Sequence, residues 1–354
     1  MDTELHVTLW PSFPHFRRFV KDTRLHGIRL NSAMINLDEL HDELEEAKTI
    51  EDVPLYFDIK GRQLRVTESI EYPDHLEVVL NHPISVQTPT PVLFKAGADH
   101  VLLERVEDGN RLIFDGGPEY KVKEGESLHI RHPSLRVSGQ IFTDTEIEKM
   151  AKAKAAGFTR YFLSYVEKQR DIDEFREHVG SDTEIIAKIE SKRGLEYVAR
   201  EYKRQEGLHL MVARGDLYVE VDKPHDILAA HKLVIAKDPE AMIGSRMLLT
   251  LMNNEVPECS DISELAWLYD IGFRRFLLCD GLCLAEKPLA RAVNVFDSVR
   301  KSYMRPTHPS IYARPVSRTN PSAPYKIASS TPPVTQPTFM RRLFNKALAR
   351  GNGQ

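Results

Sequence analysis

The chain has 354 residues, of which 42% are hydrophobic, and its formal net charge at pH 7 is -4. This length supports one barrel-sized domain with a small second domain, and the slight acidic excess excludes the basic footprint of a protein that binds nucleic acid. The three cysteines and the absence of a run of about 18 apolar residues predict a reduced, cytoplasmic protein without a membrane span.

Eight short apolar runs follow one another along the chain. They cover residues 6–10, 27–31, 54–60, 160–166, 184–190, 208–217, 241–247 and 274–280. Helical periodicity fills most of the intervals, over 36–48, 143–156, 171–179, 193–205, 226–236, 262–269 and 289–302. Strands that alternate with helices pair in parallel through right-handed crossovers. Eight such units predict an α/β fold of the closed (β/α)8 TIM barrel type, with its active site at the C-terminal ends of the strands; an open doubly wound sheet is the alternative.

One connection lacks the helical period. After residue 65 the chain shows β-rich runs separated by turn signals such as Asp108-Gly109-Asn110 and Gly116-Gly117-Pro118. The runs cover 76–80, 100–106, 111–114, 120–122 and 128–130. They predict a small β-rich lid domain at 66–138, inserted after the third strand, so that the barrel comprises residues 1–65 and 139–302.

The C-terminal segment, residues 303–354, has a different composition. Its first part is rich in Pro, Ser and Thr and cannot bury enough apolar surface to offset its chain entropy, so we expect a disordered tail. Its end, FMRRLFNKALARGNGQ, is basic and has the spacing of a short amphipathic helix. Such a helix would dock a protein partner or lie on a membrane surface. The alternative is a tail without a partner, because short isolated helices are marginal in water.

Charged residues gather at the ends of two neighbouring predicted strands. Lys188 and Glu190 end the fifth run, and Arg214 and Asp216 end the sixth. Carboxylates at the ends of neighbouring parallel strands can hold one divalent cation, and Mg²⁺ prefers such hard oxygen ligands. Together with Arg29 these are five charged groups, a concentration that ion pairs kept for stability alone explain poorly. We therefore predict a metal and oxyanion site, with internal ion pairs as the alternative.

Four segments resemble motifs of the pyruvate kinase family, and the order of elements resembles that family over most of the chain before the tail. The segments are HGIRLNSAMI at 26–35, YFDIKGRQLRV at 56–66, AKIESKRGLEYV at 187–198 and MVARGDLYVEV at 211–221. The family also inserts its lid domain after the third barrel strand. The resemblance therefore implies a pyruvate kinase barrel with a lid, and Mg²⁺ or Mn²⁺ as cofactor.

The resemblance implies roles for residues at the barrel mouth. Lys188 matches the lysine that stabilises the enolate and the migrating phosphoryl group. Glu190 and Asp216 match the magnesium ligands. Arg29 matches the arginine that contacts the transferred phosphate, and Ser245 keeps the hydroxyl of a threonine associated with protonation of the enolpyruvate.

Other motif residues are matched as well. Arg214 and Gly215, which precede the aspartate of the fourth motif, are expected at the substrate. Arg65, which the second motif keeps, is expected at the nucleotide. Asn31 and Asp58 match ligands of a monovalent cation, K⁺ in the family.

The chain also departs from the family pattern. Ala33 replaces a serine ligand of potassium, and neutral Gln63 replaces the glutamate that accompanies potassium dependence, so we expect little response to K⁺. Tyr218 replaces a glycine and enlarges the rim of the site. The family's SGETA loop reads Cys279-Asp280-Gly281-Leu282-Cys283 here, without the glutamate. The paired LPG and LP segments of the lid and the C-terminal regulatory domain have no counterpart.

The resemblance implies a magnesium-dependent phosphotransferase of glycolysis that acts on phosphoenolpyruvate with ADP or ATP, or on a related 2-oxo acid. Two alternatives stay open, because a TIM barrel supports many chemistries. One is a metal-dependent lyase or aldolase that acts on 2-oxo acids. The other is a catalytically weakened barrel kept as a binding or regulatory protein. Nucleic acid is not expected as a partner, and a homo-oligomer stays open.

Overall fold

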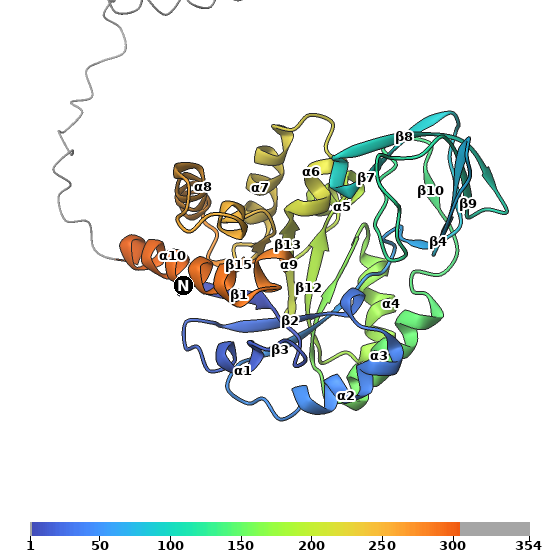
Figure 1. Cartoon of the computed structure of the whole chain (residues 1–354). Coiled ribbons are helices and arrows are strands. Elements are labelled where there is room, and N and C mark those ends of the chain that lie inside the picture. Colours follow the sequence, from blue (N-terminus) through green and yellow to red (C-terminus); the bar gives the residue numbers. More distant parts are fainter. Residues whose placement is uncertain (1, 305–354) are drawn as a thin grey trace, which may run out of the picture. The chain divides into compact units, whose positions relative to one another are not determined.

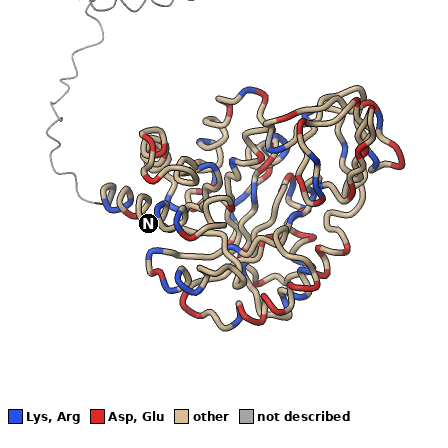
Figure 2. The backbone as a smooth tube through the Cα atoms, viewed as in Figure 1, with Lys and Arg blue, Asp and Glu red and all other residues tan. Residues whose placement is uncertain are grey.

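The structure is a computed structural model that describes residues 2–304, apart from the side chains of Ala96, Tyr303 and Met304 (Figure 1). The predicted tail lies outside the described residues from 305 onwards, and so does its basic amphipathic end. Within the described part of the chain, no helix is both long enough and apolar enough to cross a membrane. Acidic and basic residues are interspersed along the described backbone (Figure 2).

Eight parallel strands close into a barrel, which confirms the predicted (β/α)8 fold and excludes the open sheet. The strands are β1 (Glu4–Thr8), β2 (Gly27–Asn31), β3 (Leu55–Ile59), β11 (Arg160–Leu163), β12 (Glu184–Ile189), β13 (Leu208–Ala213), β14 (Met242–Gly244) and β15 (Arg275–Leu277). They follow chain order around the barrel, and β1 closes the ring against β15, with Glu4 opposite Arg275. All eight apolar runs of the sequence contribute a strand.

Helices surround the barrel (Figure 1). The longer ones are α2 (Leu37–Ala47), α3 (Asp144–Ala155), α4 (Gln169–Val179), α5 (Lys192–Arg200), α7 (Asp226–Lys237), α8 (Cys259–Asp270) and α10 (Glu286–Met304). Short turns of helix are α1 (Phe16–Phe19), α6 (Arg214–Glu220), α9 (Asp280–Cys283), η1 (Ser32–Met34), η2 (Lys95–Gly97) and η3 (Leu249–Met252). Side-chain caps begin several of them: Thr143 and Glu146 form a capping box at α3, and Ser191 caps α5. The final helix extends two residues beyond the predicted end of the barrel at 302.

One predicted strand is wrong in its second half. The run at 208–217 is extended only as far as Ala213, and Arg214–Glu220 forms α6 instead. The neighbouring strand β14 has only three residues, and its last one, Gly244, pairs with Ala213. Beyond Ala213 no residue of β14 remains for the chain to pair with, and the chain continues as a helix. As a result Asp216 lies in the first turn of a helix that begins directly after a barrel strand.

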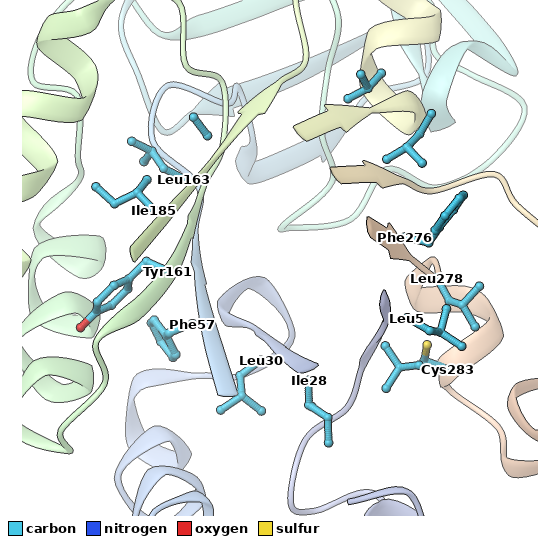
Figure 3. Close-up of a cluster of buried hydrophobic side chains, with 14 of the residues drawn as sticks. Leu5, Ile28, Leu30, Phe57, Tyr161, Leu163, Ile185, Phe276, Leu278 and Cys283 are labelled. Atoms are coloured by element: carbon cyan, nitrogen blue, oxygen red, sulfur yellow. The ribbon is translucent and has the colours of Figure 1, made fainter. Parts of the chain in front are cut away.

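The core has two layers, because side chains alternate between the two faces of a strand. Residues such as Leu5, Phe57 and Phe276 point outward and pack in one large cluster with the helices, part of which is shown in Figure 3. Inside the barrel lies a smaller cluster: Tyr56, Phe162, Ile186, Met211, Ala213, Met242 and Leu277. This inner cluster fills the barrel below the C-terminal ends of its strands, so that polar side chains further along the same strands gather above it.

The segment between β3 and α3 forms an antiparallel sheet of five strands. Their order is β4 (Val66–Glu71), β5 (His75–Leu80), β9 (Arg111–Asp115), β8 (Asp99–Glu107) and β7 (Thr90–Phe94). A two-stranded sheet, β6 (Ile84–Ser85) with β10 (Arg136–Val137), accompanies it. This inserted β-segment, residues 66–138, has a hydrophobic cluster of its own, which includes Val78, Phe94 and Phe114.

Two β-rich runs of the inserted β-segment do not form strands. The run at 120–122 is irregular, and the run at 128–130 makes only one bridge, between His129 and Leu93. One edge of β7 is fully paired with β8. On its other edge, Leu93 alone forms backbone hydrogen bonds with the run at 128–130. This single bridge fixes the backbone of His129, with N···O distances of 2.9 and 3.0 Å to Leu93.

Candidate active site

Side chains alternate between the two faces of each barrel strand, and this alternation directs several of the predicted site residues to the inside of the barrel. On β12, Ile186 belongs to the inner cluster, whereas Ile185 and Ile189 pack outside. Lys188 and Glu190 continue the inner series of Ile186 with the period of two residues. The same argument places Asp58 above Tyr56 on β3. Local sequence periodicity therefore decides that these charged groups converge at the barrel mouth.

The two predicted magnesium ligands come from neighbouring strands. Glu190 follows β12 directly and is 1% exposed, while the side chain of Asp216 is 22% exposed. Burial raises the pKa of Glu190 to about 7, helped by repulsion from Asp216 and opposed by Lys188. Burial would raise the pKa of Asp216, but His129 and Lys188 lower it to about 2. The structure thus brings two hard oxygen donors together at the mouth.

Lys188 lies between two carboxylates. Its Nζ is 3.2 Å from Glu190 Oε1 and 3.5 Å from Asp58 Oδ2, and it donates a hydrogen bond to Ser164 Oγ at 2.7 Å. Burial alone would lower the pKa of Lys188, but attraction by Asp58 and Glu190 prevails and raises it. The ammonium group is therefore a fixed positive charge in the barrel mouth.

Asp58 is surrounded by cations of the chain itself. Its carboxylate is fully buried, 3.1 Å from Lys60 Nζ and 3.6 Å from Arg29 Nη1. Against the effect of burial, Lys188, Lys60 and Arg29 hold the pKa of Asp58 well below its usual range. Burial lowers the pKa of Lys60 to about 7, against the attraction of Asp58. The predicted ligand of a monovalent cation thus already has an ammonium group at its side.

Arg29 and Asn31 converge on a residue that the sequence did not mark, Asp280. Arg29 is 5% exposed, and its Nη2 donates to Asp280 Oδ1. Asn31 Nδ2 donates to Asp280 Oδ2 at 3.1 Å, while Asn31 Oδ1 accepts a hydrogen bond from the backbone N–H of Ala33 at 3.2 Å. Two residues separate the end of β15 from Asp280, which begins α9. The same strand-end argument that selected Asp216 would therefore have found it.

A second unmarked residue, His129, reaches Asp216 from the inserted β-segment. Its Nε2 lies 3.3 Å from Asp216 Oδ1, and its Nδ1 lies 2.9 Å from Glu220 Oε1. Burial would lower the pKa of His129, but Asp216 and Glu220 raise it to about 9. Tyr165 closes the group: its hydroxyl is 3.3 Å from His129 Nδ1, and its backbone N–H donates to Glu190 Oε2 at 2.8 Å. His129 thus joins the inserted β-segment to a predicted metal ligand.

The predicted nucleotide residue, Arg65, lies at the junction of the barrel and the inserted β-segment. Its Nε and Nη2 donate to Gln63 Oε1 at 3.0 and 2.7 Å, and its Nη1 donates to Gly125 O. Gln63 Nε2 in turn donates to Asp216 Oδ2 at 3.4 Å. Gln63 therefore links Arg65 to Asp216, which forms a carboxylate pair with Glu190.

Arg214 has contacts that the motif did not suggest. It is 4% exposed, and its guanidinium donates twice to Ser245 O, at 3.0 and 2.6 Å, and pairs with Glu264 on α8. These contacts direct it to the loop after β14 rather than to the carboxylate pair. Burial lowers the pKa of Arg214, and Glu264 opposes this effect. The structure thus gives Arg214 the position of a support for Ser245.

The loop that carries Ser245 is strained. Ser245 has φ +67° and Arg246 has φ +57°, values in the left-handed region that side chains other than glycine rarely adopt. Such a residue costs about 1–3 kcal/mol and is found most often at functional sites. A Cβ added to Gly215 would lie 3.7 Å from Ser245 Oγ, so these two predicted substrate residues are close neighbours. At the rim, Arg246 stacks 4.8 Å from the ring centre of Tyr218.

Comparison with known proteins points to one family. Residues 123–267 match the model of the pyruvate kinase barrel domain. The chain is 25% identical over 293 residues to a pyruvate kinase of Thermoplasma acidophilum, and this match covers 75% of the chain and 52% of that enzyme. It is 24% identical over 319 residues to a pyruvate kinase of Methanocaldococcus jannaschii, covering 84% of the chain and 69% of the enzyme.

A pyruvate kinase of Agaricus bisporus is 30% identical over 246 residues, which cover 60% of the chain and 45% of that protein. The chain thus spans about half of the length of several of these relatives, and up to 70% of others. The similarity includes the barrel and the connection that holds the inserted β-segment, and the closed ring of eight parallel strands agrees with it. The family model and these relatives therefore support the pyruvate kinase family as the one that this chain resembles.

Proposed function

We propose that the chain is a divalent-metal-dependent enzyme that forms or consumes the enolate of pyruvate or a related 2-oxo acid. The observation that supports this proposal most strongly is the position of Lys188, 3.2 Å from Glu190, with Asp216 in the first turn of the helix that follows the neighbouring strand. Transfer of a phosphoryl group between phosphoenolpyruvate and ADP is the first form of this chemistry.

Glu190 and Asp216 would hold Mg²⁺ or Mn²⁺. The donors fit such a cation, because both are carboxylate oxygens, and their mutual repulsion helps to keep the pKa of Glu190 near 7. A divalent cation between them would remove this repulsion. When bound, it supplies a Lewis acid for the oxygen atoms of a 2-oxo acid.

The other groups of the mouth would act directly on the substrate. Lys188 is oriented by Ser164 and Asp58, so its ammonium group is positioned before any negative charge develops on an enolate oxygen. Charges that are fixed in advance stabilise a transition state without reorganisation at the moment of reaction. Ser245 is our candidate for the residue that takes part in protonating the enolate carbon that becomes the methyl group. The strained turn holds its hydroxyl beside Gly215.

A second candidate is a metal-dependent lyase or aldolase on 2-oxo acids, and one contact favours it. Phosphoryl transfer needs Arg29 for the phosphate, yet Arg29 is bonded to Asp280. An unphosphorylated 2-oxo acid does not need this arginine, because its carboxylate and carbonyl oxygens can be held at the metal and Lys188. Both candidates share the enolate step.

The decisive experiment measures that shared step. Pyruvate is incubated with the protein and Mg²⁺ in D₂O, and loss of its methyl protons is followed by NMR. Lys188→Met should slow the exchange by about 10²–10³-fold, the usual effect of removing one preorganised electrostatic group. Glu190→Gln and Asp216→Asn should abolish the dependence on Mg²⁺. Glu196→Gln, which removes an exposed carboxylate on α5, should change neither.

A coupled assay for pyruvate from phosphoenolpyruvate and ADP then separates the two candidates. Formation of pyruvate identifies the kinase, and proton exchange without it identifies the lyase or aldolase. Exchange that is equally fast with Lys188→Met would contradict the role of Lys188. If exchange, phosphoryl transfer and binding of oxalate with Mg²⁺ are all absent, the enzyme proposal is wrong and a binding or regulatory role replaces it.

A further inference from the structure

A carboxylate of the chain occupies the donors that would receive an anionic ligand. Both oxygens of Asp280 are bound: Oδ1 accepts from Arg29 Nη2, and Oδ2 accepts from Asn31 Nδ2 at 3.1 Å. The two donors lie deep, at 5% and 6% exposure, whereas the Asp280 side chain is 42% exposed. Asp280 therefore covers Arg29 and Asn31 from the solvent side.

Both terminal nitrogens of Arg29 already lie beside carboxylates, whereas its Nε has no hydrogen-bond partner within the described part of the chain. Its Nη2 is bonded to Asp280, and its Nη1 lies 3.6 Å from Asp58 Oδ2. A guanidinium group binds carboxylates and phosphates through the same fork of N–H donors, so the two kinds of ligand compete for it. A phosphate that approaches Arg29 must displace Asp280 or bind beside its negative charge.

This arrangement discriminates between classes of substrate. A phosphate group carries about 1.5–2 negative charges at neutral pH, whereas a carboxylate carries one. Repulsion by Asp280 therefore acts more strongly on a phosphorylated ligand. The carboxylate pair and Lys188 lie at β12 and β13, whereas Asp280 follows β15, so a small 2-oxo acid held at the pair need not contact Asp280.

We infer that Asp280 is a specificity-determining residue, which keeps Arg29 and Asn31 occupied so that the site takes an unphosphorylated 2-oxo monocarboxylate in preference to its phosphorylated counterpart. The choice of a 2-oxo acid rests on the second form of the proposed function, the lyase or aldolase, because the kinase would have to bind phosphoenolpyruvate. The competition between Asp280 and phosphate for Arg29 does not rest on that function, and it can be measured without metal or turnover.

The test compares Asp280→Asn and Asp280→Ala with the unaltered protein by titration calorimetry. The probes are inorganic phosphate without metal, phosphoenolpyruvate with Mg²⁺, and oxalate with Mg²⁺. Removal of one negative charge next to the ligand should tighten binding of both phosphates by about tenfold or more. The affinity for oxalate should change by less than about threefold, because oxalate would bind at the carboxylate pair. Glu286→Gln removes a surface carboxylate near α9 that pairs with Arg18, and it should change none of these affinities.

The outcomes separate the two proposals. Tighter phosphate binding in both Asp280 variants, with unaltered protein that binds oxalate with Mg²⁺, supports both. Tighter phosphate binding without any oxalate binding supports the competition at Arg29 but refutes the 2-oxo acid function, and with it the substrate class. Unchanged phosphate affinity in Asp280→Asn, or weaker binding of every probe, overturns the role of Asp280. Thermal unfolding of Asp280→Asn, which keeps the shape of the side chain, shows whether the comparison is made between folded proteins.

Discussion

Replacement of Glu190 by glutamine should stabilise the metal-free protein above pH 7 while it removes metal binding. The carboxylate is almost fully buried, accepts a hydrogen bond from Tyr165 N at 2.8 Å and lies 3.2 Å from Lys188 Nζ. Burial and repulsion from Asp216 raise the pKa of Glu190 to about 7, although attraction by Lys188 opposes them. Glutamine has the same shape and carries no charge at any pH.

The direction of the effect follows from proton linkage. A carboxyl group whose pKa is higher in the folded chain contributes stability that is complete below its unfolded pKa of 4.5 and is lost as the pH rises through about 7. Above that pH the folded chain holds an ionised carboxylate in a position that favours the neutral form. A shift from 4.5 to about 7 corresponds to at most about 3 kcal/mol. Relaxation of the neighbouring groups reduces this, so we expect a gain of about 1–2 kcal/mol at pH 8.

The assay is urea unfolding of the unaltered protein and Glu190→Gln, with a chelator, at pH 4.5 and pH 8. The variant should be more stable at pH 8 only, and the two proteins should converge at pH 4.5. In a second series, Mg²⁺ at about 100 times its dissociation constant should stabilise the unaltered protein by about 2.7 kcal/mol and the variant hardly at all. Glu196→Gln provides the control for loss of a negative charge, because its carboxylate is exposed.

Two results would refute this reasoning. A variant that is less stable than the unaltered protein at pH 8 without metal would show that the ion pair with Lys188 outweighs the cost of burying the charge. Equal stabilisation of both proteins by Mg²⁺ would show that Glu190 is not a metal ligand.

Three further predictions concern neighbouring groups. Asp58→Asn leaves buried cations unpaired and should cost about 3–5 kcal/mol in urea unfolding at pH 7; a smaller loss is expected at pH 9, where Lys60, with a pKa of about 7, has released its proton. His129→Gln should destabilise the protein most below pH 6.5 and progressively less as the pH rises through about 9, because the raised pKa of His129 contributes stability only while the ring is protonated. His41→Gln, at an exposed histidine on α2, should show no such loss, and a loss in His129→Gln that is independent of pH would refute the prediction. Proton exchange or phosphoryl transfer should proceed equally in K⁺ and Na⁺, because Ala33 offers no hydroxyl ligand; saturable activation by K⁺ would contradict this.

The sequence by itself determined the barrel and the inner position of the charged residues. Eight apolar runs separated by helical periods predict a closed ring of eight parallel strands in preference to an open doubly wound sheet. The period of two residues along each strand then places Lys188 and Glu190 on the same side as Ile186, and Asp58 on the same side as Tyr56. Both signals are local, because they depend only on residues a few positions apart in the chain.

Only the tertiary structure decided which partners these residues have. The contacts of His129 with Asp216 and of Asp280 with Arg29 join segments far apart in the sequence, and those of Arg214 with Ser245 and Glu264 join separate strands and helices. These contacts depend on the point at which β13 ends, because α6 begins directly after Ala213, the residue that pairs with the last residue of β14. They depend also on the bridge between His129 and Leu93 of β7, which fixes the backbone of His129 within the inserted β-segment. No local periodicity encodes these distances, because a side chain's neighbours across a barrel are set by strand register and loop geometry rather than by the sequence on either side of it.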